Sequence, residues 1–196
     1  MRLVAPQKIM WMAWDRFQKT GRGDLIQVEF LTGMPTMFSV KKYSEALDRM
    51  RIERGVGASF QHNLVAVDPS NHKATFKTPD GQTVDKEYTF LHVSPPMGPL
   101  EVIKNSPLAD QAGWVSVDPA TLRHTNPEFA NVFALGDCSS LPTSKTAAAI
   151  TSQAPVLTEN LFSVMDTGKV ATAAYDGYTS CPVSVVVLFL FEYKAV

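Results

Sequence analysis

The side chains with the clearest capacity for chemistry stand in residues 131–149. An apolar run there ends in the tripeptide Gly-Asp-Cys at 136–138, and a Ser/Pro turn separates it from a run of alanines. This order predicts a strand, a turn and then a helix, with Thr143 or Ser144 as the capping side chain. The helix would begin at about Lys145.

A helix start of this kind favours electron-rich or anionic ligands. Its first backbone N–H groups have no partner inside the helix, and they coincide with the positive end of the helix dipole. Asp137, at the carboxyl end of the predicted strand, could accept hydrogen bonds from sugar-like hydroxyls, and Lys145 adds a positive charge. On spacing alone the alternative stays open: an ordinary strand-to-helix connection with a solvated lysine.

These residues resemble the flavin-contacting segment of the mitochondrial-type sulfide:quinone oxidoreductases. The likeness covers Gly136–Cys138 and Leu141–Ala149. Other stretches are similar to that family in the same order: 5–10, 40–43, 92–97 and 175–182. The resemblance therefore extends over nearly the whole chain.

The resemblance implies an FAD cofactor and an α/β fold. The expected fold is a partial two-dinucleotide-binding-domain flavoprotein fold, of FAD/NAD(P)-binding type, with an inserted antiparallel hairpin. Asp137 would hold the ribityl chain, and the helix start would face the pyrimidine end of the flavin. The residues expected to bind the cofactor are Gly136, Asp137, Thr143, Ser144, Lys145 and Thr146.

Cys181 is the expected catalytic residue, again by resemblance. Taken alone, a cysteine between Ser180 and Pro182 is more often an incidental thiol than a nucleophile, because a thiolate needs nearby positive charge or a helix start. In the family, two cysteines flank the flavin, and sulfide sulfur is captured there as persulfide. Cys181 matches the second cysteine, whereas Arg2 stands about where the first would be. Cys138 is expected to pack near the cofactor without that role.

Two parts of the family's pattern have no counterpart in these residues. The Gly-x-Gly-x-x-Gly turn that holds the FAD pyrophosphate is absent, and the family's amphipathic membrane segment would lie beyond Val196. The expectation is therefore a fragment that binds FAD weakly or not at all and has no activity alone. Peripheral membrane contact is expected only for a full-length protein.

Composition excludes several other functions. The chain has 196 residues and a net charge of −1, with acids and bases interspersed, which disfavours nucleic-acid binding. Neither the two cysteines nor the four scattered histidines have the spacing of a metal site. The apolar run 183–191 is shorter than the roughly 20 residues of a membrane helix and predicts a buried strand.

Hydrophobic periodicity predicts alternating helices and strands in the first half of the chain. The expected elements are a helix at 7–19, a strand at 25–31, a helix at 40–54, and short strands at 64–67, 74–77 and 86–93. Prolines at 95, 96 and 99 should stop regular structure.

In the second half, Pro155 should kink or interrupt the helix that follows Lys145, and Gly168 should end it. The predicted division is 1–97, a partial second dinucleotide domain; 98–130, a crossover; 131–168, the returning strand and helix of the FAD domain; and 169–196, the redox-cysteine loop and terminal strand.

The function implied by the resemblance is oxidation of hydrogen sulfide with electron transfer through FAD to ubiquinone, at the mitochondrial inner membrane. A small thiol or sulfite would accept the sulfur. Two alternatives remain at this point. One is another flavoprotein quinone reductase, such as an NADH:quinone oxidoreductase, although no glycine fingerprint for a nicotinamide site is present. The other is a truncated product without catalysis.

Overall fold

A computed structural model describes residues 4–186, 189–191 and 194–195 of the chain. These residues form two compact units. The first, here called the α/β unit, comprises residues 4–94 together with the described residues of 183–191. The second, here called the long-helix unit, comprises 95–182 and the described residues near the carboxyl terminus. Each is described by itself.

The α/β unit is built around a strand–helix–strand motif. Strand β1 (Glu29–Thr32) leads through helix α2 (Lys41–Glu53) to strand β2 (Gly57–Phe60), which pairs with β1 in parallel. Helix α1 (Val4–Lys19) precedes them. Both helices are confirmed, but the strand predicted at 25–31 is wrong in its first half, because Gly23–Leu25 forms a 3₁₀ turn. Strand β2 was not predicted.

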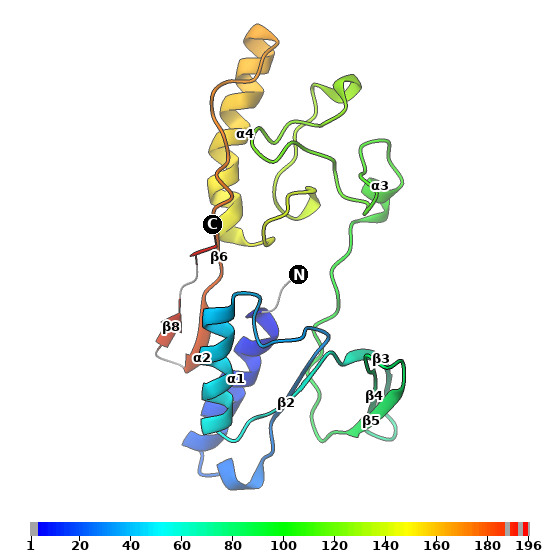
Figure 1. Cartoon of the computed structure of the whole chain (residues 1–196), viewed down its shortest axis with the longest axis vertical. Helices are drawn as coiled ribbons and strands as arrows, with labels where there is room; N and C mark the ends of the chain where they lie inside the picture. The colour runs from blue at the N-terminus through cyan, green and yellow to red at the C-terminus, as the bar shows by residue number, and fades with distance from the viewer. Residues whose placement is uncertain (1–3, 187–188, 192–193, 196) are drawn as a thin grey trace. The chain divides into compact units, whose positions relative to one another are not determined.

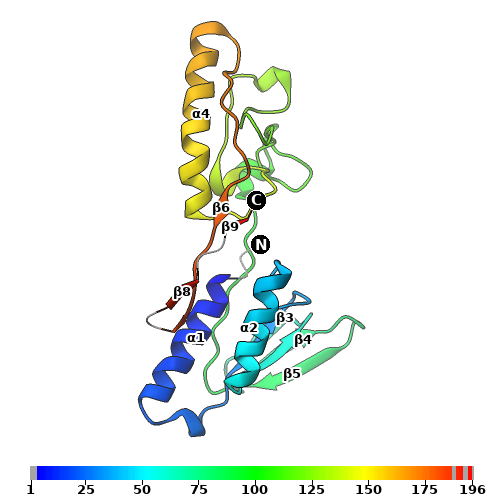
Figure 2. The same cartoon turned by 60° about the vertical axis from the view of Figure 1, so that its left-hand side comes forward.

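Arg54 ties three elements of this unit together. Its guanidinium lies over the rings of Trp11 and Trp14, at 5.2 and 4.7 Å from the ring centroids. One nitrogen of the guanidinium donates to the Val185 carbonyl at 2.6 Å, and the Trp14 indole N–H donates to the Arg54 carbonyl at 3.1 Å. Trp11 is fully buried. The end of α2 is therefore held against α1, which lies beside α2 in both views (Figures 1 and 2).

An antiparallel sheet completes the middle of this unit. It has the order β3–β4–β5, with β3 at Asn63–Asp68, β4 at Lys73–Lys77 and β5 at Thr83–Glu87. Ala74 and Phe76 point to its buried face. The predicted antiparallel hairpin is thus confirmed, although the bounds of its strands differ from the prediction. The strand predicted at 86–93 is misplaced, since pairing with β4 ends at Glu87.

Strand β7 (Val183–Val186) pairs antiparallel with β8 (Phe189–Phe191). The single buried strand predicted over 183–191 is therefore wrong, because the chain reverses within it, although Val183 and Val185 are buried as expected. At Val183 and Val185 apolar composition indicated burial correctly, but it carried no information about the reversal of the chain.

The long-helix unit contains little regular structure besides one helix. Its other elements are short: α3 (Glu101–Lys104), 3₁₀ turns at Pro127–Phe129 and Gly136–Cys138, and β6 (Thr179–Ser180), which pairs with β9 (Lys194–Ala195). No helix or strand is present at 91–100, as the prolines predicted.

The strand predicted at 131–135 is wrong. Phe133 makes only an isolated bridge to Arg123, flanked by hydrogen bonds from His124 N–H to the Val132 carbonyl and from Ala134 N–H to the Leu122 carbonyl. Leu122 has φ +63°, a left-handed conformation that turns the partner segment away and ends the ladder. The pairing is real but too short to be a strand.

Helix α4 (Ala147–Thr167) is the longest element of this unit (Figure 1). Of the two outcomes predicted at Pro155, an interruption does not occur, because the helix is continuous there, and Gly168 ends it with φ +74°, as predicted. Its inner face covers a buried cluster, toward which Val156 and Leu157 pack. The cluster consists of Val115, Val117, Leu122, Ala134, Leu141 and Tyr175.

Candidate functional site

The turn at Gly136–Cys138 is fixed by its glycine. Gly136 has φ +68°, which side-chain-bearing residues rarely adopt, and a Cβ there would lie 3.2 Å from the Ile150 side chain. The Gly136 N–H donates to Oε1 of the buried Gln153 at 2.8 Å. Helix α4 therefore holds the turn through both packing and a hydrogen bond, and it leaves Asp137 and Cys138 exposed.

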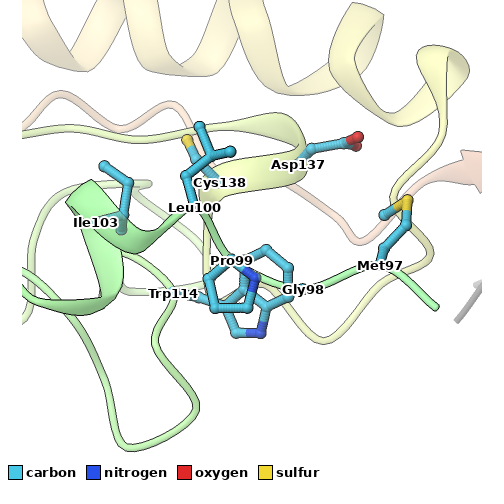
Figure 3. A pocket seen from close by; sticks show the side chains of 8 residues that line it. All are labelled: Met97, Gly98, Pro99, Leu100, Ile103, Trp114, Asp137 and Cys138. Atoms are coloured by element: carbon cyan, nitrogen blue, oxygen red, sulfur yellow. The ribbon is translucent and has the colours of Figure 1, made fainter.

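A pocket of about 340 Å³ opens beside this turn (Figure 3). Most of its wall is apolar, and Asp137 is the one carboxylate among the residues that line it. Asp137 and Cys138 come from the turn, whereas Trp114 and Pro99 come from the segments before it. The lining residues are Met97, Gly98, Pro99, Leu100, Ile103, Trp114, Asp137 and Cys138. A planar apolar group with hydroxyl donors at one end fits this arrangement.

Lys145 packs against Trp114, one of the residues that line the pocket. Its ammonium lies 4.2 Å from the centroid of the Trp114 ring and donates to the Ser139 carbonyl. Partial burial lowers the pKa of Lys145 from its usual value, while nearby Asp137, Cys138 and Asp110 act in the opposite direction. The positive charge expected at this helix start is present, but it is stacked on an indole and not freely solvated.

The cap of α4 lies further along the chain than predicted. Thr146 is the N-cap residue, and its hydroxyl accepts a hydrogen bond from the Ala149 N–H at 3.1 Å. Thr143 and Ser144, predicted as caps, precede the helix in the extended loop, and Lys145 lies just outside it. All three still adjoin the first turn of α4.

The segment 175–181 docks on this same helix start. The Tyr175 hydroxyl donates to the Tyr178 carbonyl at 2.6 Å and lies 3.4 Å from the Thr143 hydroxyl. The Thr179 hydroxyl lies 2.9 Å from that of Thr146 and donates to the Ser144 carbonyl at 3.2 Å. Two stretches separated by about thirty residues in sequence therefore share one hydrogen-bonded contact.

Cys181 follows directly after β6 and is half-buried, whereas Cys138 is exposed. Both cysteines are free thiols. Among the described residues, those lining the pocket include Cys138 but not Cys181. The residues predicted to form the site fall into two groups. Residues 136–138 form the turn at the pocket, whereas residues 143–146 and the Cys181 segment lie at the start of α4.

Sequence reasoning missed three residues that shape this region: Trp114, Tyr175 and Thr179. Tyr175 and Thr179 lie in a stretch noted for its resemblance, but nothing in the spacing indicated which side chains would reach α4. Trp114 lies outside every motif. Trp114 contacts Lys145, which is thirty-one residues away, and such a tertiary contact produces no pattern in the local sequence.

Within the part of the chain that the structure describes, no group of His, Cys, Asp and Glu side chains could hold a metal ion. The described helices likewise include none that is long and apolar enough to cross a membrane.

The chain is closely similar to part of three curated proteins, each named mitochondrial sulfide:quinone oxidoreductase. Identity is 52% with that of Dictyostelium discoideum, over 96% of this chain and 42% of the relative. It is 51% with that of Schizosaccharomyces pombe, over 91% and 39%, and 44% with that of Mus musculus, over 97% and 43%. The chain thus spans about two fifths of the length of these relatives. No family model matches it.

Solved structures extend the likeness to the fold. A chain in the Tetrahymena thermophila mitochondrial ATP synthase structure matches with a TM-score of 0.79 at 24% identity, covering 94% of this chain and 44% of that one. The sulfide:quinone oxidoreductase of Aquifex aeolicus matches with a TM-score of 0.69 at 13% identity, covering 96% and 50%. At these identities the match concerns the fold alone. The α/β fold predicted from the sequence is confirmed.

Proposed function

We propose that this chain, which is homologous over nearly its whole length to part of the mitochondrial sulfide:quinone oxidoreductases, carries the flavin-contacting and sulfur-handling part of such an enzyme. The observation that carries the proposal is the shared contact at the start of α4. There the stretch ending in Thr146 meets the stretch leading to Cys181. A cofactor contact and a sulfur-handling thiol need this proximity.

The residues at the pocket fit part of an FAD molecule. Asp137 offers carboxylate oxygens to hydroxyl donors, and the apolar wall that includes Trp114 suits a planar ring or a methylene chain. The first N–H groups of α4 favour an electron-rich edge. When bound, FAD would supply the two-electron chemistry that links sulfide to a quinone.

The contribution of the chain is to bind, orient and handle sulfur. Asp137 orients the sugar-like chain of the cofactor, and Gly136 lets the backbone make the turn that presents it. Residues 143–146 set the helix start. Cys181 would form an S–S bond to the sulfur of hydrosulfide, a step that releases one proton and two electrons, and bound FAD would be the acceptor of that electron pair. Hydrogen sulfide and ubiquinone are the proposed substrates, with a small thiol or sulfite as the sulfur acceptor.

The proposed location follows the relatives, which are mitochondrial. Because ubiquinone is a membrane quinone, we assign the activity to the inner-membrane surface. Any membrane contact would be made by the longer protein. The division of the chain at 97, 130 and 168 is retained as a proposal about which segments belong to which dinucleotide domain.

A chimera tests the proposal directly. In the Dictyostelium relative, the region that aligns with residues 3–196 of this chain would be replaced by those residues, so that the relative keeps its own residue at the place of Arg2, and sulfide-dependent reduction of decylubiquinone would be measured with sulfite present. We expect turnover with retained flavin, loss of flavin retention in Asp137→Ala, and loss of turnover in Cys181→Ser. A folded, flavin-loaded chimera that does not reduce quinone contradicts the proposal. Near-normal turnover in Cys181→Ser also contradicts it.

A further inference from the structure

Three hydrogen bonds run in series from α4 to the Cys181 segment. The Ala149 N–H donates to the Thr146 hydroxyl at 3.1 Å, the hydroxyls of Thr146 and Thr179 lie 2.9 Å apart, and the Thr179 hydroxyl donates to the Ser144 carbonyl at 3.2 Å. A hydroxyl has one proton to give. Since Thr179 gives its proton to Ser144, the bond between the two hydroxyls must be donated by Thr146.

The direction of every bond in this series is therefore determined. Each hydroxyl both accepts and donates, an arrangement in which neighbouring hydrogen bonds strengthen one another. The series closes on the backbone at both ends, at an N–H of the first turn of α4 and at the carbonyl of Ser144. Thr179 is the only side chain of β6 that the series contains.

Burial makes this contact selective for a hydroxyl. Thr179 is 3% exposed and Ser180 4% exposed, so water cannot readily replace a missing partner. Cys181 follows two residues after Thr179 and is half-buried. Tyr175 holds the preceding turn through its bond to the Tyr178 carbonyl. The thiol therefore stands at the end of a segment anchored on its amino-terminal side.

We propose that Thr179 is a positioning residue for Cys181: its hydroxyl locks the cysteine segment to the start of α4. The functional meaning of the lock rests on the proposed function, which gives Cys181 the sulfur-handling role at this helix start. The lock itself does not depend on flavin or sulfide. Neither the relatives' names nor the sequence motifs assign a role to Thr179.

The sharpest variants separate the hydroxyl from the side-chain volume. Thr179→Val keeps the shape but leaves the Thr146 hydroxyl and the Ser144 carbonyl without their buried partner. Thr179→Ser keeps the hydroxyl and loses one methyl group. Thr151→Val is the matched control, because Thr151 is exposed on α4 and its hydroxyl bonds only locally, to the Ala148 carbonyl at 2.8 Å.

The measurement is the rate of alkylation of each cysteine in the 196-residue chain, resolved by peptide mass spectrometry under native conditions. Cys138 serves as an internal reference, because it is exposed in the turn and lies outside the series. Thr179→Val removes two hydrogen bonds of the buried Thr179 hydroxyl, so we expect it to speed labelling of Cys181 by at least about fivefold, the factor for losing one of them, and to leave Cys138 unchanged. Thr179→Ser and Thr151→Val should label at the wild-type rates.

Three results would overturn the proposal. One is an unchanged Cys181 rate in Thr179→Val. Another is an equal increase at both cysteines, which would mean general loosening. The third is a Thr179→Ser variant that labels as fast as Thr179→Val, which would assign the effect to packing. Because labelling needs no flavin, an inactive chimera with a selective Cys181 effect refutes the proposed function while retaining the lock.

Discussion

The interactions that stabilise the α/β unit internally differ from those that stabilise the long-helix unit. In the α/β unit, backbone ladders and large buried side chains predominate: β1 pairs with β2 over four residues, and β3, β4 and β5 form a continuous antiparallel sheet. In the long-helix unit, the described strand pairing amounts to the two-residue match of β6 with β9 and isolated bridges. The residues with candidate chemistry all lie in the second unit.

Polar side chains substitute for ladders in the long-helix unit. Asp110 accepts from the N–H groups of Ala112 and Trp114, and Asp176 accepts from the N–H of Tyr178. Asn160, which is fully buried, donates to the carbonyls of two separate loops. Such contacts specify local geometry one residue at a time, so a single substitution can remove the contact that sets one loop.

The largest expected effect tests the packing side of the comparison. Trp11→Ala removes a fully buried indole from α1 and the stacking partner of Arg54, so it should destabilise the α/β unit by about 3–5 kcal/mol. Denaturant unfolding followed by far-UV circular dichroism measures this loss. The control, Met12→Ala, removes an exposed side chain of the same helix. A cost below about 1 kcal/mol for Trp11→Ala would show that the buried indole of Trp11 is not part of the core of the α/β unit.

The next effect tests the polar side. Asn160→Ala removes the donor that bridges the Thr121 and Ala173 carbonyls, at 3.1 and 3.0 Å, and should cost about 2–4 kcal/mol because two partly buried acceptors lose their partner. Glu159→Ala, at the neighbouring exposed position, is the control. If the two variants unfold at the same denaturant concentration, polar bridging does not hold this unit together.

The same difference explains what the sequence could and could not predict. Helices α1 and α2 were predicted nearly to their ends, because an amphipathic stripe is a local signal. The prolines before α3 and the glycine after α4 were likewise interpreted correctly. Strand β2 was missed because its four residues carry no alternation and depend on pairing with β1.

At the candidate site, the residue types at 131–149 correctly indicated a turn followed by a helix, but they did not predict the exact position of the helix start. The helix cap was expected at Thr143 or Ser144 and is Thr146, since all three are good caps and only the fold decides which of them is free to take that role. Pro155 was expected to disturb α4, yet the helix continues through it. The lysine–tryptophan contact and the Thr179 contact join distant residues, which a single sequence does not reveal.

A smaller effect compares one glycine from each unit. Gly136 and Gly81 both have left-handed backbones, with φ +68° and +82°, but a Cβ would meet Ile150 at Gly136 and nothing within 4 Å at Gly81. Gly81→Ala should therefore cost only the backbone strain, about 1 kcal/mol, and Gly136→Ala about 1 kcal/mol more. Thermal unfolding of the two variants measures the difference. Equal costs would mean that α4 does not press on the turn.

The smallest effect concerns pH and again takes one residue from each unit. Hydrogen bonds lower the pKa of Asp118, chiefly from the Thr121 N–H, and they lower the pKa of Asp80, chiefly from the Thr78 hydroxyl. A carboxyl whose folded-state pKa is lowered contributes stability above its unfolded pKa, and that contribution is lost as pH falls through the folded value. Asp118→Asn and Asp80→Asn should each flatten the acid side of the stability profile.

The difference between the two units predicts which of these two variants loses more stability. Asp118 is partly buried and organises the turn that precedes Leu122, at the centre of the long-helix unit, with contacts of 2.8–3.1 Å to Ala120 and Thr121. Asp80 stands in an exposed hairpin whose strands are already paired. Solvent screening keeps the effect of Asp118→Asn below about 1 kcal/mol, but it should exceed that of Asp80→Asn. Urea unfolding at pH 3 to 7 tests this order, and a flatter profile for Asp80→Asn than for Asp118→Asn would contradict the view that polar side chains matter more where ladders are missing.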